Sequence, residues 1–144
     1  MFSWMERDGT LSAKPMVFVV DDDPAVRSSL CWLISSIDLD VRSFPSASAF
    51  LDAVSPSQRG CAIVDVRMPG ISGLRLQREI KDRYPHLTTI IISANSSHEV
   101  AVRAVEEGAL AYLEKPINDE MLLDLVRKGL GNDPNNAAEP QLPI

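Results

Sequence analysis

A short apolar run that ends in one aspartate constrains the fold of this chain more than any other feature. Residues 61–64 read Cys-Ala-Ile-Val, which is typical of a strand buried on both faces of a sheet. Asp65 follows directly, and Pro69-Gly70 then predicts a turn. A carboxylate at the edge of a hydrophobic core costs free energy unless another group pairs with it. Because ligands bind at the carboxyl ends of strands in open parallel sheets, Asp65 is a candidate functional residue.

Similar apolar runs recur along the chain and alternate with segments of helical periodicity. We predict four further strands, over residues 16–20, 39–43, 89–93 and 110–114. Polar caps and one-sided apolar stripes predict helices that begin after Asp23, Ser46 and Asn118, and helices over residues 73–84 and 97–107. Five strands that alternate with five helices predict an α/β fold, a doubly wound five-stranded parallel sheet with helices on both faces. The flavodoxin-like strand order 2-1-3-4-5 fits this pattern.

The predicted strand order brings acidic residues from separate segments together. Its switch point lies between the first and third strands, which end in Asp21-Asp22 and in Asp65. Three carboxylates in one crevice repel one another, so they need a bound cation or raised pKa values. Because an all-oxygen ligand set favours a hard divalent ion, we predict that Asp21, Asp22 and Asp65 form a Mg²⁺ site.

Two further strand ends face the same edge of the predicted sheet. Ser93 ends the fourth strand and offers a hydroxyl, and Lys115 follows the fifth strand and offers an ammonium group. Standing alone, each would be an ordinary strand-end hydroxyl or a solvated lysine. Beside Asp65 and a cation, they complete the groups needed to transfer a phosphoryl group onto Asp65 and to stabilise its charge.

Four motifs in a fixed order carry a resemblance to a known family. They are Val-Val-Asp21-Asp22-Asp23-Pro24; Asp65 with Met68-Pro69 and Gly73; Ser93-Ala94; and Tyr112-Leu-Glu-Lys115-Pro116. With them the chain resembles the receiver domain of two-component response regulators over roughly residues 16–130. The resemblance implies a phosphoacceptor signalling module and not an enzyme. We expect residues 1–15 to be a flexible extension and residues 131–144 to be a disordered tail or a linker.

The resemblance also implies how the acidic residues act. Asp65 accepts the phosphoryl group from a sensor histidine kinase or a phosphotransfer protein. Asp22 and Asp65 bind Mg²⁺ through their side chains, and Arg67 does so through its backbone carbonyl. Asp21 assists through a metal-bound water.

The remaining family residues are implied to form the switch. Lys115 pairs with Asp65 and then with a phosphoryl oxygen, and its peptide bond to Pro116 is cis. Ser93, where threonine is commoner, donates to another phosphoryl oxygen. Tyr112 changes rotamer at the same time, although a half-buried strand aromatic is nearly as good an interpretation. The face over residues 97–130 then binds a downstream effector or output domain, or mediates a homodimer.

Composition excludes several other classes. The net charge of −6 argues against direct nucleic-acid binding. No apolar run is long enough to span a membrane, and residues 1–15 do not read as a signal peptide. Cys31 and Cys61 lie in apolar surroundings, which indicates reduced core thiols in a cytoplasmic protein.

Two alternatives remain open from the residues alone. A haloacid-dehalogenase-like phosphatase would also use Asp65 as a nucleophile, but it requires an aspartate two residues later, where Arg67 stands. A receiver-like scaffold that works without phosphorylation would not need the acceptor groups that this chain carries. The basic residues of the predicted helix over 73–84 are interpreted as a solvated face; they are Arg75, Arg78, Lys81 and Arg83.

Overall fold

The apolar runs form one parallel β-sheet. The computed structural model describes residues 14–94 and 97–131. Its strands are β1 (Met16–Val20), β2 (Val41–Phe44), β3 (Gly60–Asp65), β4 (Leu87–Ser93) and β5 (Ala111–Glu114). All neighbouring strands pair in parallel, in the order β2-β1-β3-β4-β5. The predicted fold class and strand order are therefore confirmed.

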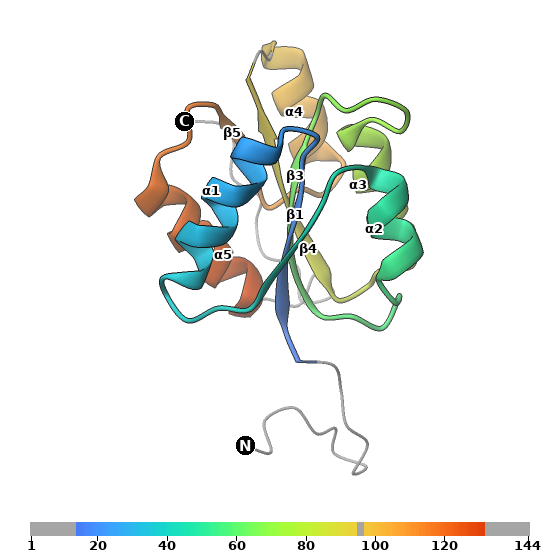
Figure 1. Cartoon of the computed structure of the whole chain (residues 1–144). Helices are drawn as coiled ribbons and strands as arrows, with labels where there is room; N and C mark the ends of the chain where they lie inside the picture. Colours follow the sequence, from blue (N-terminus) through green and yellow to red (C-terminus); the bar gives the residue numbers. More distant parts are fainter. Residues whose placement is uncertain (1–13, 95–96, 132–144) are drawn as a thin grey trace.

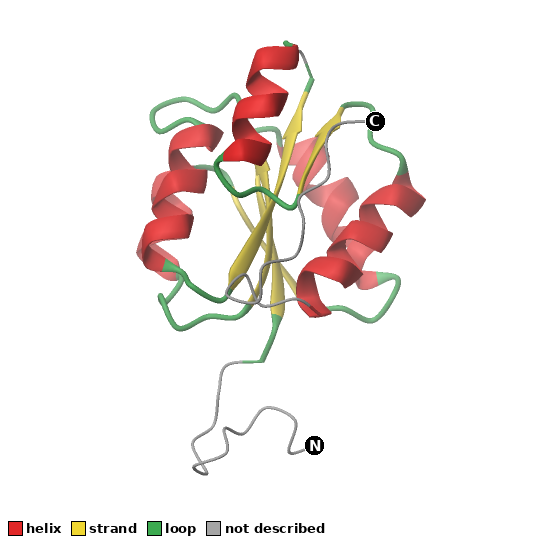
Figure 2. Ribbon diagram, turned by 180° about the vertical axis from the view of Figure 1, so that it is seen from behind, coloured by secondary structure: helices red, strands yellow, loops and turns green. Residues whose placement is uncertain are grey.

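Helices cover both faces of the sheet (Figures 1 and 2). They are α1 (Pro24–Ser35), α2 (Ala47–Ala53), α3 (Gly73–Arg83), α4 (His98–Glu106) and α5 (Asp119–Gly131). One buried cluster joins Ile63 of β3 to Ile34 of α1 and Leu122 of α5. The other joins alternate residues of the same strands to α2, α3 and α4. Because both faces are covered, the central strands are apolar throughout, and polar residues appear where the strands end.

The predicted helix caps are confirmed. The carboxylate of Asp23 accepts a hydrogen bond from the Ala25 N–H, and the Ser46 hydroxyl accepts one from Ala49. Asn118 does the same for the first turn of α5. Each cap satisfies a backbone donor that the helix itself leaves unpaired, which fixes where the chain turns from strand into helix.

The boundaries of four strands differ from the prediction by one or two residues, and β3 covers Gly60–Asp65 rather than 61–64. β4 begins at Leu87 rather than 89, because Leu87 and Thr88 pair with the first two residues of β3. β2 covers Val41–Phe44 rather than 39–43, and β5 begins at 111 rather than 110. Backbone hydrogen bonds extend the ladder beyond the apolar run in β4, and sequence periodicity does not report them.

A polar cross-link joins α3 to the C-terminal end of α4. Gln77 is 1% exposed, and its Nε2 donates to the Ala104 carbonyl at 2.7 Å. The guanidinium of Arg78 lies 3.2 Å from the Glu107 carboxylate. Arg78 is exposed, as expected for the predicted solvated face, and its half-exposed side chain in addition pairs across to the next helix. The partner is distant in sequence, so the helical pattern of α3 gave no sign of it.

The cysteines lie where the sequence indicated. Cys61 is buried in β3, Cys31 is partly buried on α1, and both are free thiols. Burial raises the pKa of Cys61 to about 12, against a smaller lowering by its hydrogen bond with Thr88. Within the described ranges, no helix has both the length and the apolar character that crossing a bilayer would require.

Candidate functional site

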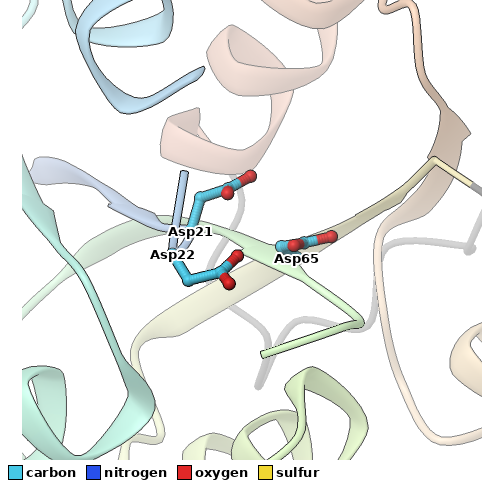
Figure 3. A group of neighbouring side chains, drawn as sticks. All are labelled: Asp21, Asp22 and Asp65. Atoms are coloured by element: carbon cyan, nitrogen blue, oxygen red, sulfur yellow. The ribbon is translucent and has the colours of Figure 1, made fainter. Parts of the chain in front are cut away.

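Three carboxylates meet at the carboxyl edge of the sheet, as the sequence predicted. Val20 of β1 and Val64 of β3 are paired, so the residues that follow them leave the sheet side by side. Oxygens of Asp21, Asp22 and Asp65 all lie within 4.8 Å of one another. Figure 3 shows the three side chains gathered at one place, two from the end of β1 and one from the end of β3. Asp21 is fully buried, Asp65 is 5% exposed and Asp22 is exposed.

Both carboxylate oxygens of Asp21 are already engaged within the protein. Oδ1 accepts a hydrogen bond from the Asp23 N–H at 2.9 Å, and Oδ2 accepts one from Lys115 Nζ at 3.0 Å. Asp22 has no such hydrogen bond among the described residues. Asp21 therefore acts as a structural anchor of the site, while Asp22 and Asp65 keep more of their oxygen lone pairs available for a cation.

The ammonium of Lys115 lies between two carboxylates. Its Nζ is 3.0 Å from Asp21 and 3.7 Å from Asp65. The family resemblance implied a pair with Asp65, and the structure adds Asp21 as the closer partner. Burial lowers the pKa of Lys115, but the hydrogen bond and charge of Asp21 and the charge of Asp65 outweigh it and raise the pKa overall. Lys115 therefore stays charged at neutral pH. Its peptide bond to Pro116 is cis.

The charge of Asp65 is poorly compensated. Burial and the neighbouring charge of Asp21 raise its pKa from 3.8 to about 6, with a further small rise from Asp22. Lys115 and a hydrogen bond from the Arg67 N–H act in the opposite direction. Because the ionised form remains disfavoured, a bound cation would stabilise this site strongly.

The loop after β3 depends on a glycine. A Cβ atom on Gly73 would lie 2.0 Å from the backbone oxygen of Asp65, which no side chain could occupy. The Gly73 N–H also donates to the Val66 carbonyl at 2.9 Å. The start of α3 thus packs directly against the backbone that carries Asp65, and this contact explains the glycine in the motif.

The two predicted switch residues lie on neighbouring strands. Ser93 is 1% exposed and ends β4, next to Asp65, because Ile92 pairs with Asp65. Tyr112 of β5 is fully buried, which corrects our interpretation of a half-buried aromatic. It packs in the core that faces α3 and α4, and its hydroxyl has no hydrogen-bond partner among the described residues.

Arg27 is a site residue that we did not predict. Its Nη1 donates to the backbone carbonyl of Asp21 at 2.7 Å, from a half-buried position on α1. The only sequence signal is its place, one helical turn after the Asp23 cap and therefore near the acidic residues. That signal is weak because an arginine on an amphipathic helix is usually solvated.

Comparison with known proteins agrees with this geometry. Residues 17–127 match the response regulator receiver domain model. The chain belongs to the response regulator receiver domain family. Members of this family act in phosphorylation-based two-component signalling, which supports the phosphoacceptor interpretation and not the phosphatase or scaffold alternatives.

The relatives that the chain resembles include named transcriptional regulators and a solved response regulator. It is 47% identical over 115 residues to the transcriptional regulatory protein FixJ of Azorhizobium caulinodans, covering 80% of this chain and 54% of that protein. It is 46% identical over 114 residues to the transcriptional regulatory protein TdiR of Thauera aromatica, covering 79% and 50%. The solved response regulator StyR superposes with a TM-score of 0.78 at 39% identity, over 86% of this chain and 63% of that one. The chain thus spans about half the length of the curated relatives it matches.

Proposed function

We propose that Asp65 is the phosphoacceptor of this receiver domain. A carboxylate oxygen of Asp65 attacks the phosphorus of a phosphohistidine on a histidine kinase or phosphotransfer protein. The new O–P bond replaces the N–P bond, and the departing imidazole nitrogen takes up a proton. The observation that carries the proposal is the convergence of Asp21, Asp22 and Asp65 within 4.8 Å, with Lys115 beside them.

The donor set of the site fits Mg²⁺. Two oxygens on opposite sides of a Mg²⁺ ion are about 4.2 Å apart, and the carboxylate oxygens of the three aspartates all lie within 4.8 Å of one another. The ion would be bound directly by the carboxylates of Asp22 and Asp65 and by the backbone carbonyl of Arg67. Asp21, whose carboxylate oxygens already accept hydrogen bonds from Asp23 and Lys115, would not bind the ion directly. Bound there, the ion would neutralise charge on the acceptor and on the transferred phosphoryl oxygens.

The other site residues stabilise the product. Lys115 lies 3.7 Å from the Asp65 carboxylate, so its ammonium can follow the new charge and bind a phosphoryl oxygen. Ser93 donates its hydroxyl to another oxygen from the end of the adjacent strand. Tyr112 of β5, which lies in the same core cluster as Ala101 and Ala104 of α4, transmits the change to the surface of these elements.

We infer that this surface carries the output. α4, β5 and α5 together expose charged residues of both signs, among them Arg103, Glu106, Asp124 and Lys128. Such a surface suits an effector protein, an output domain or a second copy of the chain. The chain acts in the cytoplasm, where ATP-dependent kinases work, as a signalling component without turnover and without direct contact to nucleic acid or membrane.

Incubation with acetyl phosphate and Mg²⁺ tests the acceptor directly. The wild type should gain one phosphoryl group by intact mass, and chelation of the metal should prevent it. Asp65→Asn should gain none, while Asp52→Asn, an exposed aspartate on α2, should behave as the wild type. Absence of label from the wild type, or label retained in Asp65→Asn, contradicts the proposal. Sizing chromatography with and without the donor then tests the dimer.

A further inference from the structure

Every polar atom of Asp21 has a partner inside the protein. Its N–H donates to the Phe44 carbonyl at 3.2 Å, and its carboxylate accepts from Asp23 and Lys115. The last atom, its backbone oxygen, accepts from Arg27 Nη1 at 2.7 Å, the shortest of these four contacts. Asp21 is thereby fixed to β2, to the start of α1, to the end of β5 and to the side of α1.

The hydrogen bond from Arg27 to the Asp21 carbonyl affects the position of Asp22 more than that of Asp21. The backbone oxygen of Asp21 and the N–H of Asp22 belong to one planar peptide group. A hydrogen bond that holds this oxygen therefore also fixes the orientation of the peptide group from which the Asp22 backbone continues. The exposed Asp22 carboxylate has no hydrogen bond of its own among the described residues. The orientation of the Asp22 carboxylate toward Asp65 therefore depends on the peptide group between Asp21 and Asp22, whose oxygen Arg27 binds.

Arg27 acts through a hydrogen bond and not through an ion pair. Its contact is with a neutral carbonyl, and within residues 14–94 and 97–131 it pairs with none of the three carboxylates. Its backbone N–H also donates to the Asp23 carbonyl in the first turn of α1. One residue thus joins the start of the helix to the end of the strand, across the peptide that carries the exposed cation ligand.

We propose that Arg27 is a positioning residue of the cation site, which holds the peptide between Asp21 and Asp22 so that the Asp22 carboxylate faces Asp65. The proposal rests on the proposed function, since that function assigns the cation to these carboxylates. It adds a requirement outside the acidic cluster: the geometry of the site is set from α1.

The test compares three variants of the full chain. Arg27→Met keeps the length of the side chain and removes the donor, and Arg27→Lys restores a donor. Arg127→Met, at an exposed position near the end of α5, makes the same change of net charge at the opposite edge of the sheet, where Gly129 packs against Thr88 and Cys61. Mg²⁺ affinity is measured by titration calorimetry. We expect it to fall about tenfold in Arg27→Met, as loss of one charge-assisted hydrogen bond predicts, and to stay within about threefold of wild type in the other two.

A second readout needs no metal. Amide hydrogen exchange at Asp21 and Asp23, whose N–H groups are hydrogen-bonded, should be faster in metal-free Arg27→Met by about tenfold and unchanged in Arg127→Met. Wild-type Mg²⁺ affinity or wild-type exchange in Arg27→Met overturns the proposal, and so does an equal loss of affinity in Arg27→Lys. If the wild type binds no Mg²⁺, the proposed function fails, and the exchange rates still decide whether Arg27 fixes this peptide.

Discussion

Replacing Asp65 by asparagine should stabilise the metal-free protein at neutral pH. The carboxylate is buried beside Asp21, and its pKa rises from 3.8 to about 6 on folding. The folded state therefore binds this proton more tightly than the unfolded state does, and stability from this group is lost as pH rises from about 4 through about 6. Asparagine removes the penalty and can still accept the hydrogen bond from the Arg67 N–H.

The size of the effect follows from the pKa of Asp65. A rise of this size corresponds to about 3 kcal/mol, at about 1.4 kcal/mol for each pKa unit. Because the crevice opens to solvent beside Asp22, screening reduces the expected gain to about 1–2 kcal/mol. Below about pH 4 the carboxyl group is protonated in both states, so the wild type and Asp65→Asn should be equally stable there.

Urea unfolding followed by circular dichroism measures this difference. The protein is freed of metal with a chelator and unfolded at about pH 7.5 and at about pH 4. Asp52→Asn on α2 is the matched control, because it loses a carboxylate from an exposed position and should change stability little at either pH.

Addition of Mg²⁺ should reverse the order of stability. A cation that binds only the folded state stabilises the wild type, and Asp65→Asn, which has lost one ligand, gains less. The reasoning is refuted if metal-free Asp65→Asn is less stable than the wild type at neutral pH, or if its gain persists unchanged in acid.

Two further predictions concern the neighbours of the site. Tyr112→Phe removes a buried hydroxyl that has no partner among the described residues, so it should leave the free energy of unfolding unchanged or raise it by up to about 1 kcal/mol; a clear loss of stability in urea would contradict this. Gly73→Ala places a Cβ atom 2.0 Å from the backbone oxygen of Asp65. It should destabilise the protein by at least about 2 kcal/mol and slow its phosphorylation. Gly131→Ala, with open space around the new Cβ atom, should change neither the stability nor the phosphorylation rate.

The fold could be predicted because its signals are local. Apolar runs that end in polar residues mark the central strands, and side chains such as Asp23 and Ser46 cap the helix beside them in sequence. Once the strand order is known, the convergence of Asp21, Asp22 and Asp65 follows from parallel pairing alone. The exact start of β4 did not follow, because its first residues join the sheet through backbone hydrogen bonds.

The contacts that sequence reasoning missed, in the site and elsewhere, are made by side chains with partners on other elements. The guanidinium of Arg27 donates to the backbone carbonyl of Asp21, six residues earlier in the chain. The side-chain amide of Gln77 donates to the backbone carbonyl of Ala104, 27 residues later. Lys115 was expected beside Asp65 but lies nearer to Asp21, because that carboxylate is fully buried and offers the closer oxygen. Periodicity and motif spacing identify the element that carries a residue but not the atom that its side chain contacts.

The contact between Asp21 and Lys115 joins residues 94 positions apart, at the ends of two strands that are not neighbours in the sheet. A nascent chain that has emerged from the ribosome only as far as β4 has its acidic residues but lacks the ammonium that balances them. The buried charge of Asp21 is therefore balanced by this ammonium only after the chain has been synthesised through Lys115, so the charge balance of the acidic site depends on the closed domain.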